Sequence, residues 1–326
     1  MAISPIQRFG IGMARVLRLR RHCMLVYRHE YLVSIESGDE RSSFEVMKFK
    51  RILDELVREG LVRRKDVLKP SMLGDAELLL VHDRAYIASL RSPLRIAELL
   101  TLRTVHPWDN PVMEYVRYVA GGTVLALRAA YARAMTVFNL GGGFHHAYPD
   151  RASGFCLVND VAVAIAVLRR ESRVRRVLII DLDFHHGDGT AWIFRDDPSV
   201  FTFSIHHQHW VEPGSTATVD VALPDHIDDG PYLAELRRRL PAVLDSFHPE
   251  VVVYLAGSDP FIEDTLGTFR VSEAGMLKRD MYVYREVRRR GLPLAVVAGG
   301  GYGPQSWRIY YNFIRHAFLL GRRYRT

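Results

Sequence analysis

The stretch "VLIIDLDFHHGDGT", residues 177–190, determines how the rest of the sequence is interpreted. It opens with a continuous apolar run, which is typical of a strand that is covered on both faces of a sheet. Side chains two positions apart on an extended backbone project to the same side, so Asp183 and His185 are expected to act together. In all, three acids and two histidines fall within eight positions: Asp181, Asp183, His185, His186 and Asp188.

Apolar runs like this one recur along the 326 residues, and stretches with the spacing of amphipathic helices lie between them. We expect strands at 23–27, 78–81, 135–140, 176–182, 200–205, 251–257 and 294–299, and helices at 43–60, 111–134, 232–247 and 272–291. This alternation predicts an α/β fold with a mostly parallel sheet between helical layers. No repeat or linker divides the chain, so we expect a single domain over residues 1–326, with 1–20 as a basic N-terminal extension.

The composition limits the partners and the location. The net charge is +7, and the basic residues gather in runs such as "RRESRVRR" and "YREVRRR". We interpret these runs as solvated helix faces and do not expect a nucleic-acid partner, because aromatic residues do not interleave with them. No apolar run reaches the roughly 18 residues that span a bilayer, and the start lacks the apolar region of a signal peptide. We therefore expect a cytoplasmic protein without a membrane span.

The unusual residues come directly after the apolar runs. "GGGFHHA", "DFHHGDG", "HHQHW", "SDP" and "GGY" each follow one of them. The carboxyl ends of parallel strands meet along one edge of a sheet, where ligand sites of α/β proteins form. These five segments are therefore expected to share one pocket.

Asp183 and His185 are candidate metal ligands. With a third carboxylate they would leave a position open for water, which is typical of a catalytic rather than a structural divalent metal. Asp259, in "LAGSDP" after another strand, is the best candidate for that carboxylate. The alternative is that the acids cap a helix that begins near Gly187, but capping needs only one of them. The two cysteines form no CxxC pair, so the metal would be held by histidine and carboxylate.

His145 and His146 are candidate proton carriers, since imidazole titrates near neutral pH. Adjacent side chains serve one site only where the backbone turns sharply, and the preceding "GGG" allows such a turn. Asp181 and Asp188 are natural partners, because a carboxylate on the second ring nitrogen fixes the tautomer. The alternative is a pair of buried histidines with structural roles.

In order and spacing, "GGGFHHA", "GFCLVNDVAVA", "DLDFHHGDGT", "SDP" and "AGGGY" resemble the histone deacetylase family of metal-dependent amidohydrolases. The resemblance covers roughly residues 20 to 320 and implies the arginase/deacetylase-like fold. The part from "VVVYLAGSD" to "AVVAGGGY" is most similar to the class IV branch and its bacterial relatives, whereas "HHGDG" is the form seen in classes I and II. The family often has His-Pro in its first loop, where this chain reads "ESGDERSS".

The resemblance implies a role for each of the residues singled out above. Asp183, His185 and Asp259 would bind Zn²⁺, and Fe²⁺ is a second candidate because two carboxylates form a harder ligand set than three histidines. His145 would pair with Asp181 and His146 with Asp188. The Tyr302 phenol would hydrogen-bond the substrate carbonyl and stabilise its oxyanion.

The family resemblance also implies which residues contact the substrate. Gly154 and Phe155 would line a narrow tunnel for an acyl-lysine chain, and either His209 or Trp210 would form the opposite wall. Asp109 would grip the substrate backbone at the rim, although an Asx turn before Pro111 explains it equally well. Ser204 would help bind a monovalent cation, K⁺, near Asp181 and Asp183.

The predicted function is a zinc-dependent amidohydrolase that removes acetyl or longer acyl groups from lysine side chains of proteins and peptides, or from related acylated amines. His146 would take the proton of the attacking water. One alternative is a non-catalytic acyl-lysine or DNA-binding protein that retains the fold. Another is an arginase-like ureohydrolase, but "GSDPFIEDTLG" lacks the further ligands of the "DxDxxDP" kind that two Mn²⁺ ions require. The acyl length and the oligomeric state are left open.

Overall fold

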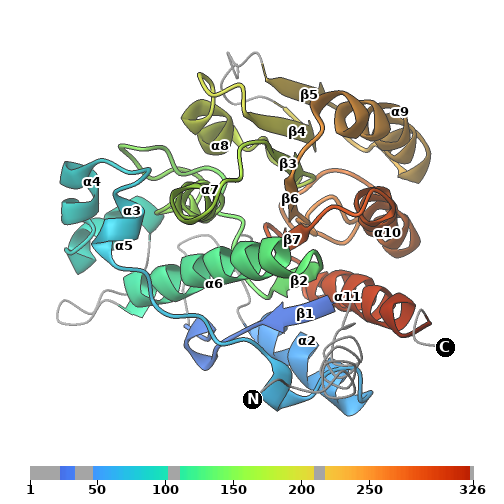
Figure 1. Cartoon of the computed structure of the whole chain (residues 1–326), viewed down its shortest axis with the longest axis horizontal. Helices are drawn as coiled ribbons and strands as arrows, with labels where there is room; N and C mark the ends of the chain where they lie inside the picture. The colour runs from blue at the N-terminus through green and yellow to red at the C-terminus, as the bar shows by residue number, and fades with distance from the viewer. Residues whose placement is uncertain (1–22, 34–46, 102–110, 209–216, 324–326) are drawn as a thin grey trace, which may run out of the picture.

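The structure is a computed structural model of the chain, and it describes residues 23–33, 47–101, 111–208 and 217–323 (Figure 1). Its centre is a sheet of seven strands in the order β1-β2-β7-β6-β3-β4-β5, and every neighbouring pair is parallel. The strands are β1 (Cys23–Val26), β2 (Thr136–Asn139), β3 (Val177–Asp181), β4 (Val200–His206), β5 (Thr218–Ala222), β6 (Val251–Leu255) and β7 (Leu294–Val297). The expected parallel α/β sheet is therefore confirmed.

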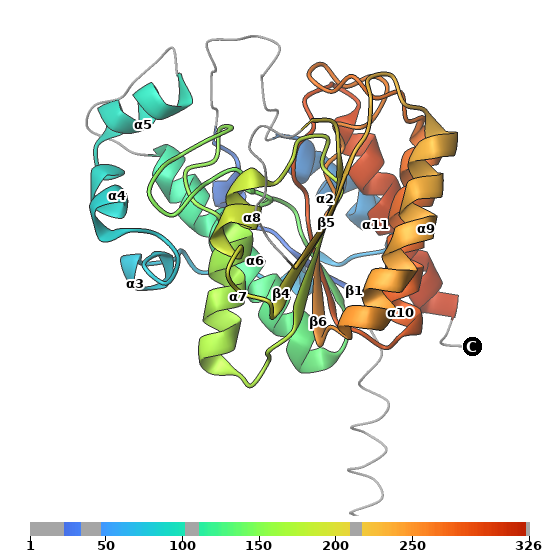
Figure 2. The ribbon, with the colours of Figure 1, turned by 90° about the horizontal axis from the view of Figure 1, so that it is seen from above.

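Two helical layers cover the sheet, as Figure 2 shows with the strands seen nearly edge-on. One layer contains α6 (Pro111–Arg133), α7 (Asp160–Glu171) and α8 (Asp188–Ile193). The other contains α2 (Met47–Arg58), α9 (Asp229–Phe247), α10 (Glu273–Arg289) and α11 (Ser306–Arg323). The short helices α3 (Asp75–Leu78), α4 (Arg84–Ser89) and α5 (Pro93–Leu100) lie outside the first layer. The central strands β3, β6 and β7 are buried between the two layers, which explains their continuous apolar sequences.

The register of the strands aligns their carboxyl ends. Asp181, the last residue of β3, lies opposite Ser204 of β4 on one side and Leu255 of β6 on the other. Ser204 in turn lies opposite Asp220 of β5. The polar segments that follow β2, β7, β6, β3 and β4 therefore leave the sheet side by side along one edge.

Two expectations about the elements differ from the structure. The run "LLLV" at 78–81 is not a strand: Leu78 ends α3 and the next residues form a turn. The backbone N–H of Gly74 donates to Glu77 Oε2 at 3.0 Å, a helix-start contact that the apolar run conceals. Conversely, β5 was not expected, because Thr218 and Asp220 interrupt the apolar residues of "TVDVA".

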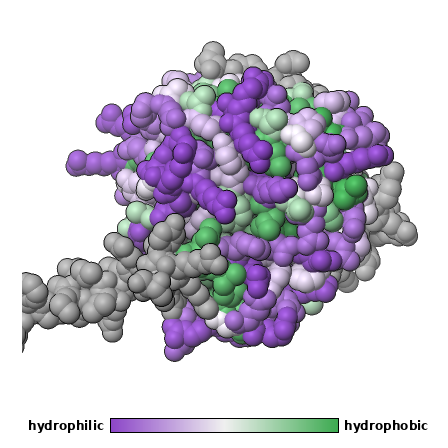
Figure 3. Space-filling model, turned by 90° about the vertical axis from the view of Figure 1, so that its right-hand side faces the viewer, coloured by the Kyte–Doolittle hydropathy of each residue, from purple (hydrophilic) through white to green (hydrophobic). Residues whose placement is uncertain are grey.

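The face formed mainly by α9, α10 and α11 is largely hydrophilic (Figure 3). Basic residues of the run "YREVRRR" pair there with acids: Arg289 with Glu286 at 2.5 Å and Arg290 with Asp245 at 2.7 Å. No helix among the described residues is long and apolar enough to cross a membrane. The expected cytoplasmic location and the absence of a nucleic-acid partner stay predictions.

Candidate active site

Three predicted metal ligands meet beyond the ends of β3 and β6, and we call them the Asp183 cluster: Asp183, His185 and Asp259. His185 Nδ1 lies 3.2 Å from Asp183 Oδ1 and 3.1 Å from Asp259 Oδ2. The other oxygen of each carboxylate is held by the backbone, since Gly300 N–H donates to Asp183 Oδ2 at 2.7 Å and Phe184 N–H donates to Asp259 Oδ1 at 2.9 Å. One oxygen of each acid and one ring nitrogen thus face each other.

The charges of this cluster favour a bound cation. Both carboxylates are buried, with at most 1 % of each residue exposed. Burial and the adjacent charge of Asp183 raise the pKa of Asp259 to about 8. Two carboxylates this close repel each other, and a divalent ion between them is the arrangement that stabilises both in the charged form.

The two glycine loops bring the cluster and the histidines together. Gly143 has φ of 87°, and a Cβ built on it would lie 2.6 Å from the Cα of Gly299, so the loops after β2 and β7 touch through bare backbone. A Cβ on Gly300 would lie 2.3 Å from Asp259 Oδ2. Side chains at these positions would push the loops apart, which explains why both segments are glycine-rich.

The two adjacent histidines each contact one carboxylate, in the pairs that the family resemblance implied. His145 Nδ1 lies 2.8 Å from Asp181 Oδ2, and His146 Nδ1 lies 2.6 Å from Asp188 Oδ1. The two Nε2 atoms are 3.1 Å apart. All four side chains are buried, so these contacts fix the orientation of both rings.

The two imidazoles differ in basicity. At His145, burial favours the neutral form, but the charges of Asp181 and Asp183 outweigh it and raise the pKa to about 9. At His146, burial and the neighbouring charge of His145 lower the pKa to about 4. His146 is therefore neutral at pH 7 and can accept a proton.

A cavity of about 100 Å³ opens onto these groups and is bordered by Tyr302. Tyr302 follows the glycine loop after β7, and its backbone N–H donates to Asp264 Oδ2 at 2.8 Å. Burial and the charges of Asp259 and Asp183 raise the pKa of its phenol well above the usual value, so the hydroxyl keeps its proton. A protonated phenol at the cavity wall is a hydrogen-bond donor to whatever the cavity holds.

Gly154 and Phe155 border the same cavity. A Cβ on Gly154 would lie 2.2 Å from His146 Cδ2, so only glycine allows the chain to pass this close to the imidazole. Phe155 has φ of 63° and is 48 % exposed. A bulky residue held in the left-handed region is typical of a position under functional constraint.

Other predicted site residues give no such geometry. Asp109, His209 and Trp210 lie outside the described residues. Ser204 is described and buried, and its hydroxyl lies 2.8 Å from His206 Nδ1. It lies opposite Asp181 in the sheet register, beside the expected place of the monovalent cation.

Sequence reasoning missed two residues that hold the site together. Asp160 accepts from the backbone N–H groups of Gly143 at 3.1 Å and Phe144 at 2.7 Å, and thus anchors the loop before the histidines. The preceding Asn159 caps α7, because its side chain accepts from Ala162 N–H at 2.9 Å. Asn159 and Asp160 both lie in the motif "GFCLVNDVAVA", but nothing in its apolar pattern indicated that Asp160 contacts another loop.

The second missed residue is Arg279 of α10, which is fully buried. It donates to the carbonyls of Leu182 at 3.0 Å and Gly257 at 2.8 Å, beyond the ends of β3 and β6. Its charge is balanced by Asp280, 2.8 Å away. The sequence signal was an Arg-Asp pair inside an amphipathic helix, which is easily taken for a solvated face.

This geometry agrees with what similarity to known proteins shows. The histone deacetylase domain matches residues 42–314, most of the chain. The chain belongs to the histone deacetylase family. It is therefore a hydrolase of amide bonds, a deacetylase or deacylase of a metal-dependent family, and the resemblance stated from its motifs is confirmed.

Several relatives span most of this deacetylase. It is 33 % identical to an uncharacterised protein of Picosynechococcus over 90 % of this chain and 96 % of the relative. It is 30 % identical to histone deacetylase 2 of Arabidopsis thaliana, over 91 % and 79 % of the two chains. The acetoin utilization protein AcuC of Staphylococcus aureus is 29 % identical, over 86 % and 77 %.

Solved structures show the same fold. A histone deacetylase homologue complexed with SAHA superposes with a TM-score of 0.77 and 27 % identity, covering 91 % of this chain and 84 % of the homologue. A homologue from Aquifex aeolicus superposes with a TM-score of 0.76 and 28 % identity over the same shares. The arginase/deacetylase-like fold expected from the sequence is thus confirmed.

Proposed function

We propose that this deacetylase-family protein is a zinc-dependent lysine deacylase whose centre is the Asp183 cluster. The observation that carries the proposal is the facing of two carboxylate oxygens and one ring nitrogen at 3.1 and 3.2 Å. Ligands of a four-coordinate zinc with bonds of about 2.0–2.1 Å stand about 3.3 Å apart, so the three atoms fit one ion. Two carboxylates are a hard ligand set, and Fe²⁺ is the rival ion.

A bound divalent ion would supply a Lewis acid for the acyl carbonyl and lower the pKa of its water. The chain supplies the proton transfers. His146 has the lowered pKa of a neutral acceptor and takes the proton of the attacking water, while Asp188 holds its ring. His145 and Asp181 form a charged pair next to His146.

Tyr302 is the proposed oxyanion donor. Its phenol stays protonated, and it borders the cavity together with Asp183 and His185. Hydrogen bonds to the charge that develops on the carbonyl oxygen are stronger in the transition state than in the ground state, and such bonds increase the rate. Tyr302 therefore contributes to turnover more than to substrate binding.

The substrate is proposed to be an acyl-lysine of a protein or peptide, or an acylated amine, whose alkyl chain passes Phe155. The cavity wall is otherwise rich in apolar side chains, contributed by Leu100, Val112, Val116 and Leu157. Apolar walls favour acyl groups longer than acetyl, since each buried CH₂ contributes about 0.8 kcal/mol. Asp109 and either His209 or Trp210 stay the proposed contacts at the rim.

A series of acyl substrates tests this proposal. Purified protein would be assayed on one lysine peptide that carries acetyl, butyryl, octanoyl or myristoyl groups, and on acetylated polyamines. We expect kcat/KM to rise with chain length on the peptides. Replacing Val116 by Phe would fill part of the cavity and move the preference back toward acetyl. Hydrolysis of polyamines alone would contradict the lysine deacylase and leave the acylated amine as the substrate.

The monovalent site at Ser204 is a separate proposal. Ser204 lies opposite Asp181, so K⁺ bound there would touch the carboxylate that holds His145. We expect turnover to depend on K⁺ concentration. Replacing Ser204 by Ala should weaken that dependence.

A further inference from the structure

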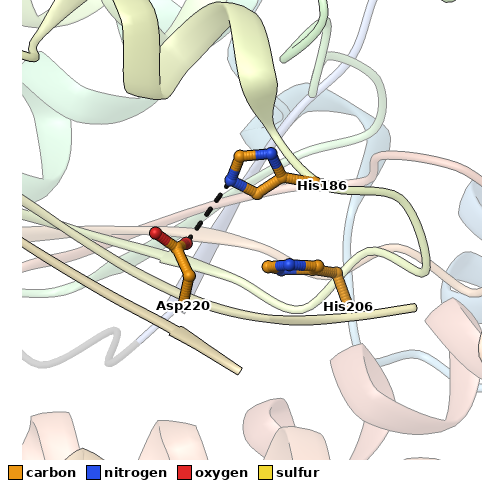
Figure 4. Close-up of side chains that lie close together, drawn as sticks. All are labelled: His186, His206 and Asp220. Atoms are coloured by element: carbon orange, nitrogen blue, oxygen red, sulfur yellow. Dashed lines mark ion pairs between the residues drawn. The ribbon is translucent and has the colours of Figure 1, made fainter. Parts of the chain in front are cut away.

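A second group of side chains lies beside the active site, and we call it the His186 cluster: His186, His206 and Asp220. His186 follows β3, His206 ends β4 and Asp220 lies in β5, so three separate segments contribute one residue each. Figure 4 shows the His186 ring above that of His206, with Asp220 beside them. No part of the deacylase chemistry described above uses these three residues.

The distances in the His186 cluster suit ligands of one metal ion. His186 Nε2 and Asp220 Oδ1 are 3.4 Å apart, longer than the 2.7–3.2 Å of most N–H···O hydrogen bonds. It is close to the separation of about 3.3 Å between two ligands of a tetrahedral zinc. The centroids of the two imidazole rings are 4.5 Å apart, and one ligand atom from each residue lies within 4.8 Å of the others.

Neighbouring hydroxyls orient the cluster in the way that metal ligands are usually oriented. His206 Nδ1 lies 2.8 Å from the Ser204 hydroxyl, an arrangement that directs the other ring nitrogen to a ligand. The Thr218 hydroxyl donates to Asp220 Oδ2 at 2.7 Å, while Oδ1 is the oxygen that faces His186. His206 and Asp220 therefore each have one polar atom held by a hydroxyl, which leaves His206 Nε2 and Asp220 Oδ1 as the atoms available to a metal ion.

The surroundings fit a bound ion that is closed off from substrate. The side chains of His186 and Asp220 expose only 1 % and 7 % of their surface, and His206 is fully buried. A cavity of about 10 Å³ adjoins His186 and Asp220 and is also bordered by Asp181, Thr202 and Ser204. That volume is close to the minimum that holds one water-sized species. An ion here would have no room for an organic substrate.

We infer that the His186 cluster is a second, structural site for a divalent transition metal of the zinc type. Two imidazoles and one carboxylate form the ligand set, and a water in the small cavity or a further protein oxygen would complete it. The ion would tie the segment before α8 to β4 and β5. That segment carries His185 of the Asp183 cluster and leads into Asp188, the first residue of α8 and the partner of His146, so the second ion would support the backbone of the active site.

Metal counting on the full-length protein tests this inference. Protein would be purified with added Zn²⁺, dialysed against metal-free buffer and analysed for zinc per chain. We expect two ions in the unaltered protein and one each in Asp259→Asn and His206→Ala. The double variant should bind none, and His248→Asn, which removes an exposed histidine that belongs to neither cluster, should keep two.

X-ray absorption at the zinc edge distinguishes the two sites without relying on variants of the His186 cluster. The zinc that Asp259→Asn retains should be bound by two imidazoles, whereas the Asp183 cluster offers one. This measurement decides the question even if His206→Ala fails to fold. One ion in the unaltered protein and none in Asp259→Asn would overturn the inference, as would two ions in folded His206→Ala.

The same data separate this inference from the proposed function. If Asp259→Asn keeps full turnover, the Asp183 cluster is not the catalytic centre, and the second site still stands on the loss of one ion in His206→Ala. If Asp259→Asn loses turnover together with the only ion, the proposed function stands and the second site falls.

Discussion

The Asp183 cluster and the His186 cluster share the loop after β3 but face different surroundings. His185 and His186 are consecutive, yet the first borders a cavity of about 100 Å³ and the second a cavity of about 10 Å³. The His185 side chain is 17 % exposed, against 1 % for His186. The comparison indicates that a reactive metal site differs from a structural one mainly in whether substrate can reach the ion. The type of ligand matters less, because catalysis needs an open coordination position.

The ligand sets also differ in hardness. The Asp183 cluster has two carboxylates and one imidazole, whereas the His186 cluster has two imidazoles and one carboxylate. Imidazole suits zinc and the later first-row metals, while oxygen ligands also accept harder ions. The two clusters should therefore differ in how readily Fe²⁺ replaces Zn²⁺, with the easier replacement at the Asp183 cluster.

The largest expected effect is on turnover when an acid of the open cluster is changed. Asp259→Asn should lower kcat by at least about 10³-fold, because Lewis-acid activation contributes several kcal/mol and 1.36 kcal/mol corresponds to tenfold. The matched change Asp220→Asn in the closed cluster should lower kcat by less than about tenfold. Steady-state kinetics on one acyl-lysine peptide measures kcat of both variants. An equal decrease in kcat would contradict the assignment of one cluster as catalytic and the other as structural.

Tyr302→Phe should lower kcat by about 100-fold, the usual effect of losing one oxyanion donor. The variant lacks only a hydroxyl, so its zinc content and its affinity for a hydroxamate inhibitor should stay near those of the unaltered protein. Kinetics and inhibitor titration provide the two measurements. A parallel loss of metal would mean that Tyr302 supports the cluster rather than the transition state.

The pH dependence reports the lowered pKa of His146. A base must be deprotonated to act, so kcat/KM should be constant through the neutral range and fall about tenfold per pH unit as the pH drops below about 4. The profile would be measured with zinc content checked at each pH. His145→Asn removes the neighbouring charge and should move this limb toward higher pH; a limb near 6.5 in the unaltered protein would contradict the assignment.

The smallest expected effect concerns stability. In the Asp259→Asn background, zinc at 100 times its Kd should raise the free energy of unfolding by about 2.7 kcal/mol through the His186 cluster alone. Thermal unfolding with and without zinc measures this gain as a shift in Tm. Adding His206→Ala to that background should remove the shift, and a shift that persists would place the ion elsewhere.

The sequence predicted the sheet because buried parallel strands are continuous apolar runs of characteristic length. It failed at 78–81, where a helix start outweighed three leucines, and it missed β5, whose Asp220 interrupts the apolar pattern. The residues of the Asp183 cluster were predictable because acids and histidines after strands have few structural uses. Their geometric grouping is observed in the structure, whereas their catalytic roles stay predictions.

The residues that support the site could not be predicted from the pattern of residue types along the chain. Asp160 and Arg279 act through backbone groups of other segments, and no spacing along the chain records such contacts. The segment "HHQHW" begins with His206, which the sequence did not identify as a ligand because its partner Asp220 lies in the strand that the sequence did not reveal. A missed edge strand thus concealed one third of the second cluster.

The wide spacing of the ligands along the chain has a consequence for biogenesis. His185 and Asp259 are 74 positions apart, and Gly300, which holds Asp183, is 117 positions beyond it. A ribosome must therefore release nearly the whole polypeptide before the pocket for the reactive ion can exist. Loading of the reactive ion has to be a late event, because truncated products that end before β7 would lack the Gly300 N–H group that holds Asp183.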